Sequence, residues 1–200
     1  ISRPKDIAPI QYNPNNKWII SIGRFDNNEQ KRYDILLQSF ARFHALHPDY
    51  KLLLYGSGPL EKQLKQWAKE LSIENCIEWK GVTSSSMKMM AQTGGIFLIT
   101  SDSEGISNAL LEAMAVGMPV VSTDHNPGGA RLLISDHDNG LIAPMADVAK
   151  LCRALCEYAE HPELAEKCGK KAQEVLIRFA PQKLLNRWNE YLHSVIANKK

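Results

Sequence analysis

The segment from residue 96 to residue 123 constrains the fold more than any other part of the chain. Two short apolar runs, at 96–100 and 119–123, have the length and composition of buried strands. Between them, apolar side chains recur at helical spacing from Leu110 to Ala115, and Gly117 predicts the end of that helix. The segment therefore predicts a strand, a helix and a second strand joined by short connections.

The same alternation extends over most of the chain. We expect further strands at 18–22, 51–55, 76–79 and near 138–144, and helices near 34–43, 60–71, 84–91, 146–160, 162–179 and 181–197. Such alternation predicts an α/β fold, a Rossmann-like parallel sheet with helices on both faces. Residues 1–16 carry three prolines and little periodicity, so we expect a linker there and a single domain over 17–197. The last helix should pack its apolar stripe on the sheet or on another domain.

Composition narrows the classes of protein to consider. Two hundred residues can bury a single substantial core, and a net charge of +2 argues against a dedicated nucleic-acid binder. No apolar run approaches the roughly 20 residues that a membrane-spanning helix needs. Cys152, Cys156 and Cys168 fall on apolar helical stripes, which predicts buried, reduced thiols and favours the cytoplasm.

Two carboxylates frame the start of the helix in the 96–123 segment. Glu104 precedes the helix, Glu112 lies on its second turn, and Ser107 or Asn108 can cap it. A helix N-terminus suits a phosphate, because its first N–H groups are unpaired and carry partial positive charge. Carboxylates cannot bind phosphate, but they accept hydrogen bonds from sugar hydroxyls. Together these groups predict a site for a nucleotide sugar.

This segment resembles a signature of a known enzyme family. Glu104–Gly105, Asn108–Ala115, Gly117 and Pro119–Val121 resemble the E-x7-E motif of retaining glycosyltransferases with the GT-B fold, the GT4-like "glycosyl transferases group 1". The resemblance covers roughly residues 17–197 and implies the C-terminal, donor-binding domain of such an enzyme, with residues 1–16 leading from a missing N-terminal domain.

The resemblance also implies roles for individual residues. Arg24 and Lys31 would hold the donor diphosphate, Glu112 would accept from the ribose, and Glu104 would accept from the donor sugar. Glu104, Arg24 and Lys31 would be the catalytic residues. The implied substrate-binding residues are Gly23, Arg24, Lys31, Gly56, Gly58, Val82, Glu104, Gly105, Ile106, Ser107, Asn108, Ala109 and Glu112.

The implied activity is transfer of a sugar from a nucleoside-diphosphate sugar to an acceptor hydroxyl, in bacterial surface polysaccharide or glycolipid synthesis. It needs no metal and no cofactor besides the donor itself. The saccharide or lipid-linked acceptor would bind through the N-terminal domain, so this piece alone would bind without turnover. We expect the cytoplasm or the inner face of the cell membrane as its location, with peripheral membrane contact by the full-length protein.

Two other interpretations remain open. The chain could be a non-catalytic module that binds nucleotide sugars, or a metal-dependent transferase, because Asp102-Ser-Glu104 and Asp136-His-Asp138 imitate an Asp-x-Asp metal motif. A dinucleotide fingerprint after the second strand fails, since its third glycine position is Glu61. No G-x-S-x-G motif occurs, and spacing alone gives none of the six histidines a partner.

Overall fold

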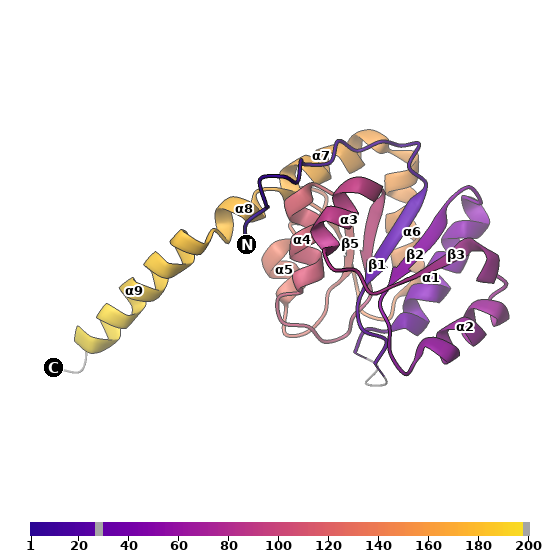
Figure 1. The fold of residues 1–200 in the computed structure, drawn as a ribbon, viewed down its shortest axis with the longest axis horizontal. Coiled ribbons are helices and arrows are strands. Elements are labelled where there is room, and N and C mark those ends of the chain that lie inside the picture. The colour runs from indigo at the N-terminus through magenta and orange to yellow at the C-terminus, as the bar shows by residue number, and fades with distance from the viewer. Residues whose placement is uncertain (27–29, 198–200) are drawn as a thin grey trace.

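The computed structural model describes residues 1–26 and 30–197 and contains one six-stranded parallel sheet (Figure 1). The strands are β1 (Trp18–Ile22), β2 (Lys51–Tyr55), β3 (Ile77–Gly81), β4 (Ile96–Ile99), β5 (Val120–Thr123) and β6 (Leu141–Ala143). Their order is β3-β2-β1-β4-β5-β6. This is the doubly wound Rossmann order: β2 and β3 are added on one side of β1, and β4, β5 and β6 on its other side.

The helices follow the strands in alternation. They are α1 (Tyr33–Leu46), α2 (Glu61–Glu70), α3 (Ser86–Thr93), α4 (Asn108–Val116), α5 (Gly129–Leu133), α6 (Val148–Glu160), α7 (Pro162–Ala172), α8 (Val175–Arg178) and α9 (Pro181–Ala197), with a 3-10 turn η1 at Glu74–Cys76. Most agree with the sequence prediction within a few residues. The expected helix at 162–179 is instead two helices, α7 and α8, and α5 was not predicted.

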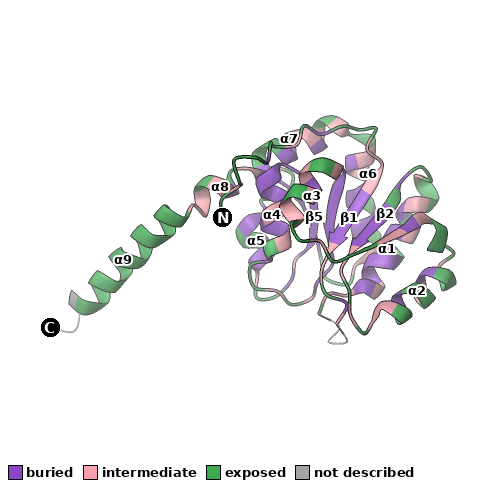
Figure 2. Ribbon diagram, in the orientation of Figure 1, coloured by how far each residue is buried: buried purple, intermediate pink, exposed green. Residues whose placement is uncertain are grey.

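Side chains alternate between the two faces of the sheet, and each face has its own apolar core. Leu52 and Leu54 of β2 pack with α1, α2 and α6, whereas Leu53 packs on the opposite face with α3 and α4. Figure 2 shows the central strands and the inward helix surfaces buried, whereas the edge strand β3 is buried only at Ile77. Helices on both faces confirm the predicted Rossmann-like class, because only a covered parallel sheet hides two apolar faces.

Residues 1–16 contain no helix or strand, yet they lie against the domain. Ile7 and Tyr12 are buried, and the backbone N–H of Ile10 donates to the carbonyl of Val116 at 2.7 Å. Arg3 donates to the carbonyl of Ala115 at 3.1 Å. The division of the chain at residue 16 stays a prediction.

Helix α9 extends away from the rest of the molecule, and residues 181–196 are exposed (Figures 1 and 2). The prediction that its apolar stripe packs on the sheet is therefore wrong, and packing on another domain stays a prediction. The stripe is strongly apolar, and its large side chains are Leu184, Leu185, Trp188, Tyr191, Leu192, Val195 and Ile196.

The four cysteines are free thiols. Cys152, Cys156 and Cys168 are buried as predicted, whereas Cys76 is only partly buried. Within the described parts of the chain, no helix is both long and apolar enough to cross a bilayer.

Candidate functional site

Four loops with predicted site residues meet at one edge of the sheet. Residues 23–24 follow β1, residues 56–58 follow β2, residue 82 follows β3, and residues 104–108 follow β4. Because these four strands are parallel and adjacent, their carboxyl ends lie along the same edge. The predicted convergence of these loops is confirmed.

The loops after β1, β2 and β3 enclose a hollow of about 250 Å³. Gly56 has a φ of 151°, and a Cβ there would lie 1.9 Å from the carbonyl oxygen of Gly23. Only glycine therefore lets the turns after β1 and β2 touch. The hollow contains four of the predicted binding residues, and its full lining is Ile22, Gly23, Arg24, Tyr55, Gly56, Ser57, Val82, Thr83 and Ser86.

Glu112 is connected to this hollow through a serine that the sequence analysis did not single out as a site residue. The hydroxyl of Ser86, at the start of α3, donates a hydrogen bond to Oε2 of Glu112 on α4. Ser85 caps α3 by accepting from the N–H of Lys88, so Ser86 is free to hold the carboxylate. Three consecutive serines, where one suffices for a cap, are the sequence signal for this second role.

Glu104 forms an ion pair with Lys31. The Glu104 side chain is 17% exposed and that of Lys31 is 29% exposed, so the pair is partly shielded from water. The hydroxyl of Ser101 also donates to Glu104, at 3.2 Å. The resemblance assigned these two charges to different parts of a ligand, and the structure brings them into direct contact.

The loop that carries Glu104 is fixed by backbone hydrogen bonds to the loop after β5. The N–H of Glu104 donates to the carbonyl of Asn126 at 2.8 Å, and the N–H of Asn126 donates to the carbonyl of Asp102 at 3.0 Å. The buried ring of His125 donates from Nδ1 to the carbonyl of Glu104 at 3.1 Å. Burial lowers the pKa of His125, so the ring is neutral at pH 7. Sequence reasoning found no role for His125.

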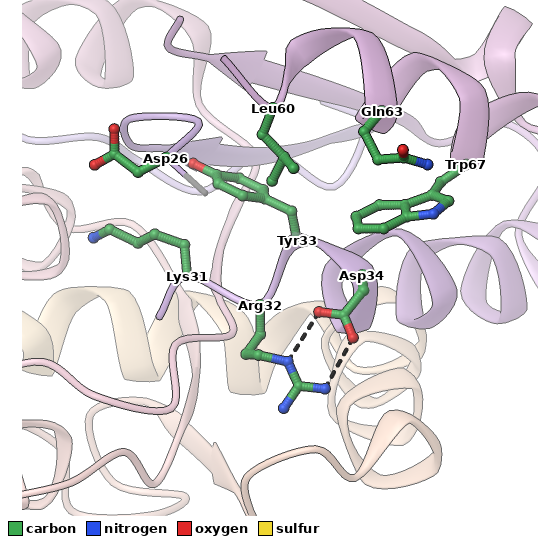
Figure 3. Close-up of a pocket in the computed structure, with 8 residues that line it drawn as sticks. All are labelled: Asp26, Lys31, Arg32, Tyr33, Asp34, Leu60, Gln63 and Trp67. Carbon is green, nitrogen blue, oxygen red and sulfur yellow. Dashed lines mark hydrogen bonds and ion pairs between the residues drawn. The ribbon is translucent and has the colours of Figure 1, made fainter. Parts of the chain in front are cut away.

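Arg32 connects the start of α1 to the loop after β4. Its guanidinium donates to both oxygens of Asp34, at 2.9 and 2.8 Å (Figure 3). It also donates to Asp102 at 2.6 Å. Its φ is 46°, an unusual left-handed conformation for a side chain of this size. The hydroxyl of Thr100 donates to the carbonyls of Lys31 and Arg32 at 3.0 Å each. These contacts position Lys31 next to Glu104.

A larger hollow of about 540 Å³ lies between the start of α1 and α2 (Figure 3). Its lining is Asp26, Lys31, Arg32, Tyr33, Asp34, Leu60, Gln63 and Trp67. Its four charged side chains form ion pairs within the chain, and of the predicted site residues it contains only Lys31. The smaller hollow is therefore the better candidate for the nucleotide, despite its size.

Of the other predicted residues, five surround the start of α4, whereas Arg24 follows β1 and Gly58 follows β2. Ser107 caps α4 by accepting from the N–H of Leu110, while Gly105, Ile106 and Asn108 are exposed and Ala109 is partly exposed. Arg24 is 84% exposed in its side chain and lies 3.2 Å from Asp26. Gly58 packs against the backbone of Phe25 instead of lining the hollow.

In the part of the chain that the structure describes, neither acidic motif belongs to a group of side chains with metal-ligand spacing. Asp102 is paired with Arg32 and Glu104 with Lys31, while Asp136 pairs with His137 at 3.0 Å. Among residues 1–26 and 30–197, the one group with metal-ligand spacing is His47, Cys156 and Glu160, between α1 and α6. That group does not include any predicted site residue.

The sequence of the chain matches one known protein family over most of its length. The model of the family "Glycosyl transferases group 1" matches residues 2–175. The chain belongs to this family. Its sheet is one Rossmann-like half of the GT-B fold.

Curated relatives in this family are about twice as long or longer. The chain is 32% identical over 176 residues to N-acetylgalactosamine-N,N'-diacetylbacillosaminyl-diphospho-undecaprenol 4-alpha-N-acetylgalactosaminyltransferase of Campylobacter jejuni, covering 88% of this chain and 46% of that protein. It is 28% identical over 185 residues to N-acetyl-alpha-D-glucosaminyl L-malate synthase of Bacillus anthracis, with 92% and 47% covered.

Solved structures share the fold. A mutant of S. aureus TarM, in complex with Fondaparinux, alpha-GlcNAc-glycerol and UDP, superposes with a TM-score of 0.84 at 23% identity, over 94% of this chain and 38% of that one. Anabaena HepE, solved with UDP and glucose, has a TM-score of 0.78 at 24% identity, over 90% and 49%. The chain thus spans less than half of each.

Proposed function

We propose that this chain is the donor-binding half of a retaining glycosyltransferase. The protein would transfer a sugar from a nucleoside-diphosphate sugar to an acceptor hydroxyl. One observation carries the proposal: Glu104 and Glu112, with seven residues between them, flank the N-terminus of α4, and each already has a polar partner at the same sheet edge. A carboxylate on either side of a phosphate-binding helix end matches the alternating hydroxyl and phosphate groups of such a donor.

Lys31 would lie between the donor sugar and the diphosphate, in contact with Glu104 on one side and with a phosphate oxygen on the other. An ammonium group has three N–H donors, so Lys31 can keep its bond to Glu104 and still donate to a phosphate oxygen. The departing nucleoside diphosphate gains negative charge in the transition state, and a cation already in place stabilises that charge. Arg24, at the mouth of the smaller hollow, is exposed enough to turn from Asp26 toward the same phosphates.

The two carboxylates would bind hydroxyls. Glu112, held by Ser86 beside the hollow, would accept from the ribose, and the base would enter the hollow next to Val82. Glu104 would accept from hydroxyls of the donor sugar. We assign Glu104 a positioning contact and not a nucleophilic attack, because its charge is neutralised by Lys31.

The proposal includes independence from metal ions. A divalent cation between Asp102 and Glu104 would have to displace Arg32 and Lys31, which already supply positive charge there. Chelator should therefore leave donor binding unchanged, whereas a metal-dependent transferase would lose it.

The proposed process is assembly of a bacterial polysaccharide or glycolipid. The name of the Campylobacter relative specifies a diphospho-undecaprenol-linked acceptor, which supports a saccharide or lipid-linked acceptor for this family member too. Acceptor binding by an N-terminal domain, location in the cytoplasm or at the inner membrane face, and hexosyl transfer remain predictions.

The test is calorimetric titration of the chain with UDP, GDP and ADP in EDTA. UDP is tested first, because TarM and HepE were solved with it. Glu112→Gln and Arg24→Ala should each weaken binding by about 1.5–3 kcal/mol, the cost of one charge-assisted hydrogen bond, or roughly 10- to 150-fold. Arg42→Ala, an exposed cation on α1, is the matched control and should bind like the parent.

Equal affinities for the parent and both site variants would refute the residue assignment. Loss of binding in EDTA, restored by a divalent cation, would favour the metal-dependent alternative. A chain that binds UDP but shows no transfer or hydrolysis of UDP-sugars, even within its longer protein, would be the non-catalytic module.

A further inference from the structure

Cys76 and His44 form a hydrogen-bonded pair at the edge of the sheet opposite the candidate donor site. Sγ of Cys76, at the end of η1, lies 3.0 Å from Nε2 of His44 on α1. Nδ1 of the same ring lies 2.8 Å from the carbonyl oxygen of Tyr50, just before β2. A thiol, an imidazole and an orienting acceptor thus lie in a row, and the thiol lies 32 positions along the chain from the imidazole.

The hydrogen bonds determine which nitrogen of His44 carries the proton. A carbonyl oxygen can only accept, so Nδ1 must be the N–H donor to Tyr50. In the neutral ring Nε2 is then the unprotonated nitrogen, and its lone pair faces the thiol of Cys76. The imidazole is therefore arranged as a base toward Cys76.

The ring is held in this orientation by packing as well. Phe40, one helical turn earlier on α1 and fully buried, stacks on it with ring centroids 5.5 Å apart and planes tilted by 31°. A base, an adjacent nucleophile and a group that orients the base are the elements of an activated nucleophile. Partial burial leaves both His44 and Cys76 in contact with solvent.

The other three cysteines are shielded from solvent, whereas Cys76 is only partly buried. Cys152, Cys156 and Cys168 are buried, and burial raises the pKa of each thiol, that of Cys156 to about 12. The thiolate is the reactive form of cysteine, so we expect these three to react slowly in the folded chain. The contrast singles out Cys76.

We propose that Cys76 is a thiol-modification site that reacts with low-molecular-weight disulfides, with His44 as the base. The proton of the Cys76 thiol passes to Nε2 of His44, and the Sγ electron pair attacks one sulfur of the disulfide. A new S–S bond forms, the original S–S bond breaks, and its electron pair leaves with the second sulfur as a thiolate. The disulfide is the oxidant, and Cys76 becomes a mixed disulfide.

This site is separate from donor binding. Cys76 immediately precedes β3 and Val82 immediately follows it, so the two residues lie at opposite ends of a strand of five residues, roughly 17 Å long. Modified and unmodified chain should therefore bind UDP equally, and the two proposals can fail independently.

The test is the reaction of the folded chain with excess dithiobis(nitrobenzoate) at pH 7.5. Its rate is measured from the absorbance of the coloured thiolate that each reacting cysteine releases. We expect one of the four thiols to react rapidly and peptide mass mapping to place the adduct on Cys76. Cys76→Ser should abolish the fast phase. His44→Asn should slow it by about fivefold or more, since a positioned base contributes at least roughly 10²-fold in enzymes and less at an open site.

His44→Asn is chosen because the asparagine amide can still donate to the Tyr50 carbonyl while it offers no base to the thiol. His193→Asn on the exposed helix α9 is the control and should react like the parent. An unchanged rate in His44→Asn overturns the proposal, as does a fast phase that maps to another cysteine. If His44→Asn fails to fold, the mapping in the parent chain decides.

Discussion

Gly129→Ala tests how the Glu104 loop is positioned. Gly129 is the first residue of α5, and its Cα lies directly against the backbone of Gly105, the residue after Glu104. A Cβ at position 129 would lie 1.6 Å from the carbonyl oxygen of Gly105 and 3.2 Å from Cε1 of His125. To restore an ordinary contact of 3.4 Å, one of the two backbones must move by roughly 1.8 Å.

Neither backbone can move freely. The Glu104 loop is tied to Asn126 by a hydrogen bond of 2.8 Å, and Asn126 is tied back to Asp102 at 3.0 Å. Overpacking of a fixed contact costs typically about 1–3 kcal/mol. For a chain of this size each kcal/mol lowers Tm by roughly 2–4 °C, so Gly129→Ala should lower Tm by about 2–12 °C.

The assay combines thermal unfolding with UDP titration. The displaced loop carries Glu104, which pairs with Lys31, the proposed ligand of the diphosphate. We therefore expect the variant to bind UDP more weakly and to unfold at a lower temperature. Gly105→Ala is the stability control, since a Cβ there meets nothing within 4 Å and its backbone conformation suits any residue. A variant that melts within 1 °C of the parent and binds UDP equally would refute the proposed role of the contact.

Three further predictions concern other parts of the chain. Residue 32 has a left-handed backbone conformation that glycine adopts without strain and alanine does not. Arg32→Ala and Arg32→Gly both lose the ion pairs to Asp34 and Asp102, so Arg32→Ala should be less stable in urea than Arg32→Gly by about 1–2 kcal/mol. Equal free energies of unfolding for the two variants would contradict this. Burial lowers the pKa of His125 in the folded chain. Below about pH 6.5, His125 therefore binds a proton in the unfolded chain more readily than in the folded chain. The free energy of unfolding should therefore fall as pH drops from 7 to 5, and more steeply than in His125→Asn, whereas parallel curves would show that His125 does not contribute. Deleting residues 180–200 should change Tm by less than about 2 °C, because α9 side chains at 181–196 are exposed; a large drop would mean that α9 supports the core.

The sheet and most helices could be predicted because their signals are local and periodic. Leu52, Leu53 and Leu54 form a run that only a strand covered on both faces accommodates. Helix α5 gave no such signal, since its five residues make little more than one turn and begin with glycine. The break between α7 and α8 was missed because the apolar pattern continues through it, from Ala172 to Val175.

The site was predicted only in part, for a different reason. Glu104 and Glu112 were singled out because their spacing and surroundings resemble a family motif, and Lys31 was assigned through the same resemblance. The ion pair between Lys31 and Glu104 joins residues 73 positions apart, and no spacing rule connects them. His125 escaped notice because its contact is with a backbone carbonyl, which every residue possesses.

Two backbone hydrogen bonds, from Glu104 to Asn126 and from Asn126 to Asp102, form a clamp between the loops after β4 and β5. This clamp affects which positions near Glu104 can be substituted. The two N–H···O bonds that hold Glu104 involve main-chain atoms, and so they are indifferent to the side chains at positions 103 and 126. Substitutions at these two exposed positions should alter the rim beside the proposed donor-sugar site while Glu104 itself stays in place. Under the proposed function, the clamp separates the placement of the carboxylate from the selection of the sugar. A library randomised at Ser103 and Asn126 should then vary sugar preference while the position of Glu104 is kept.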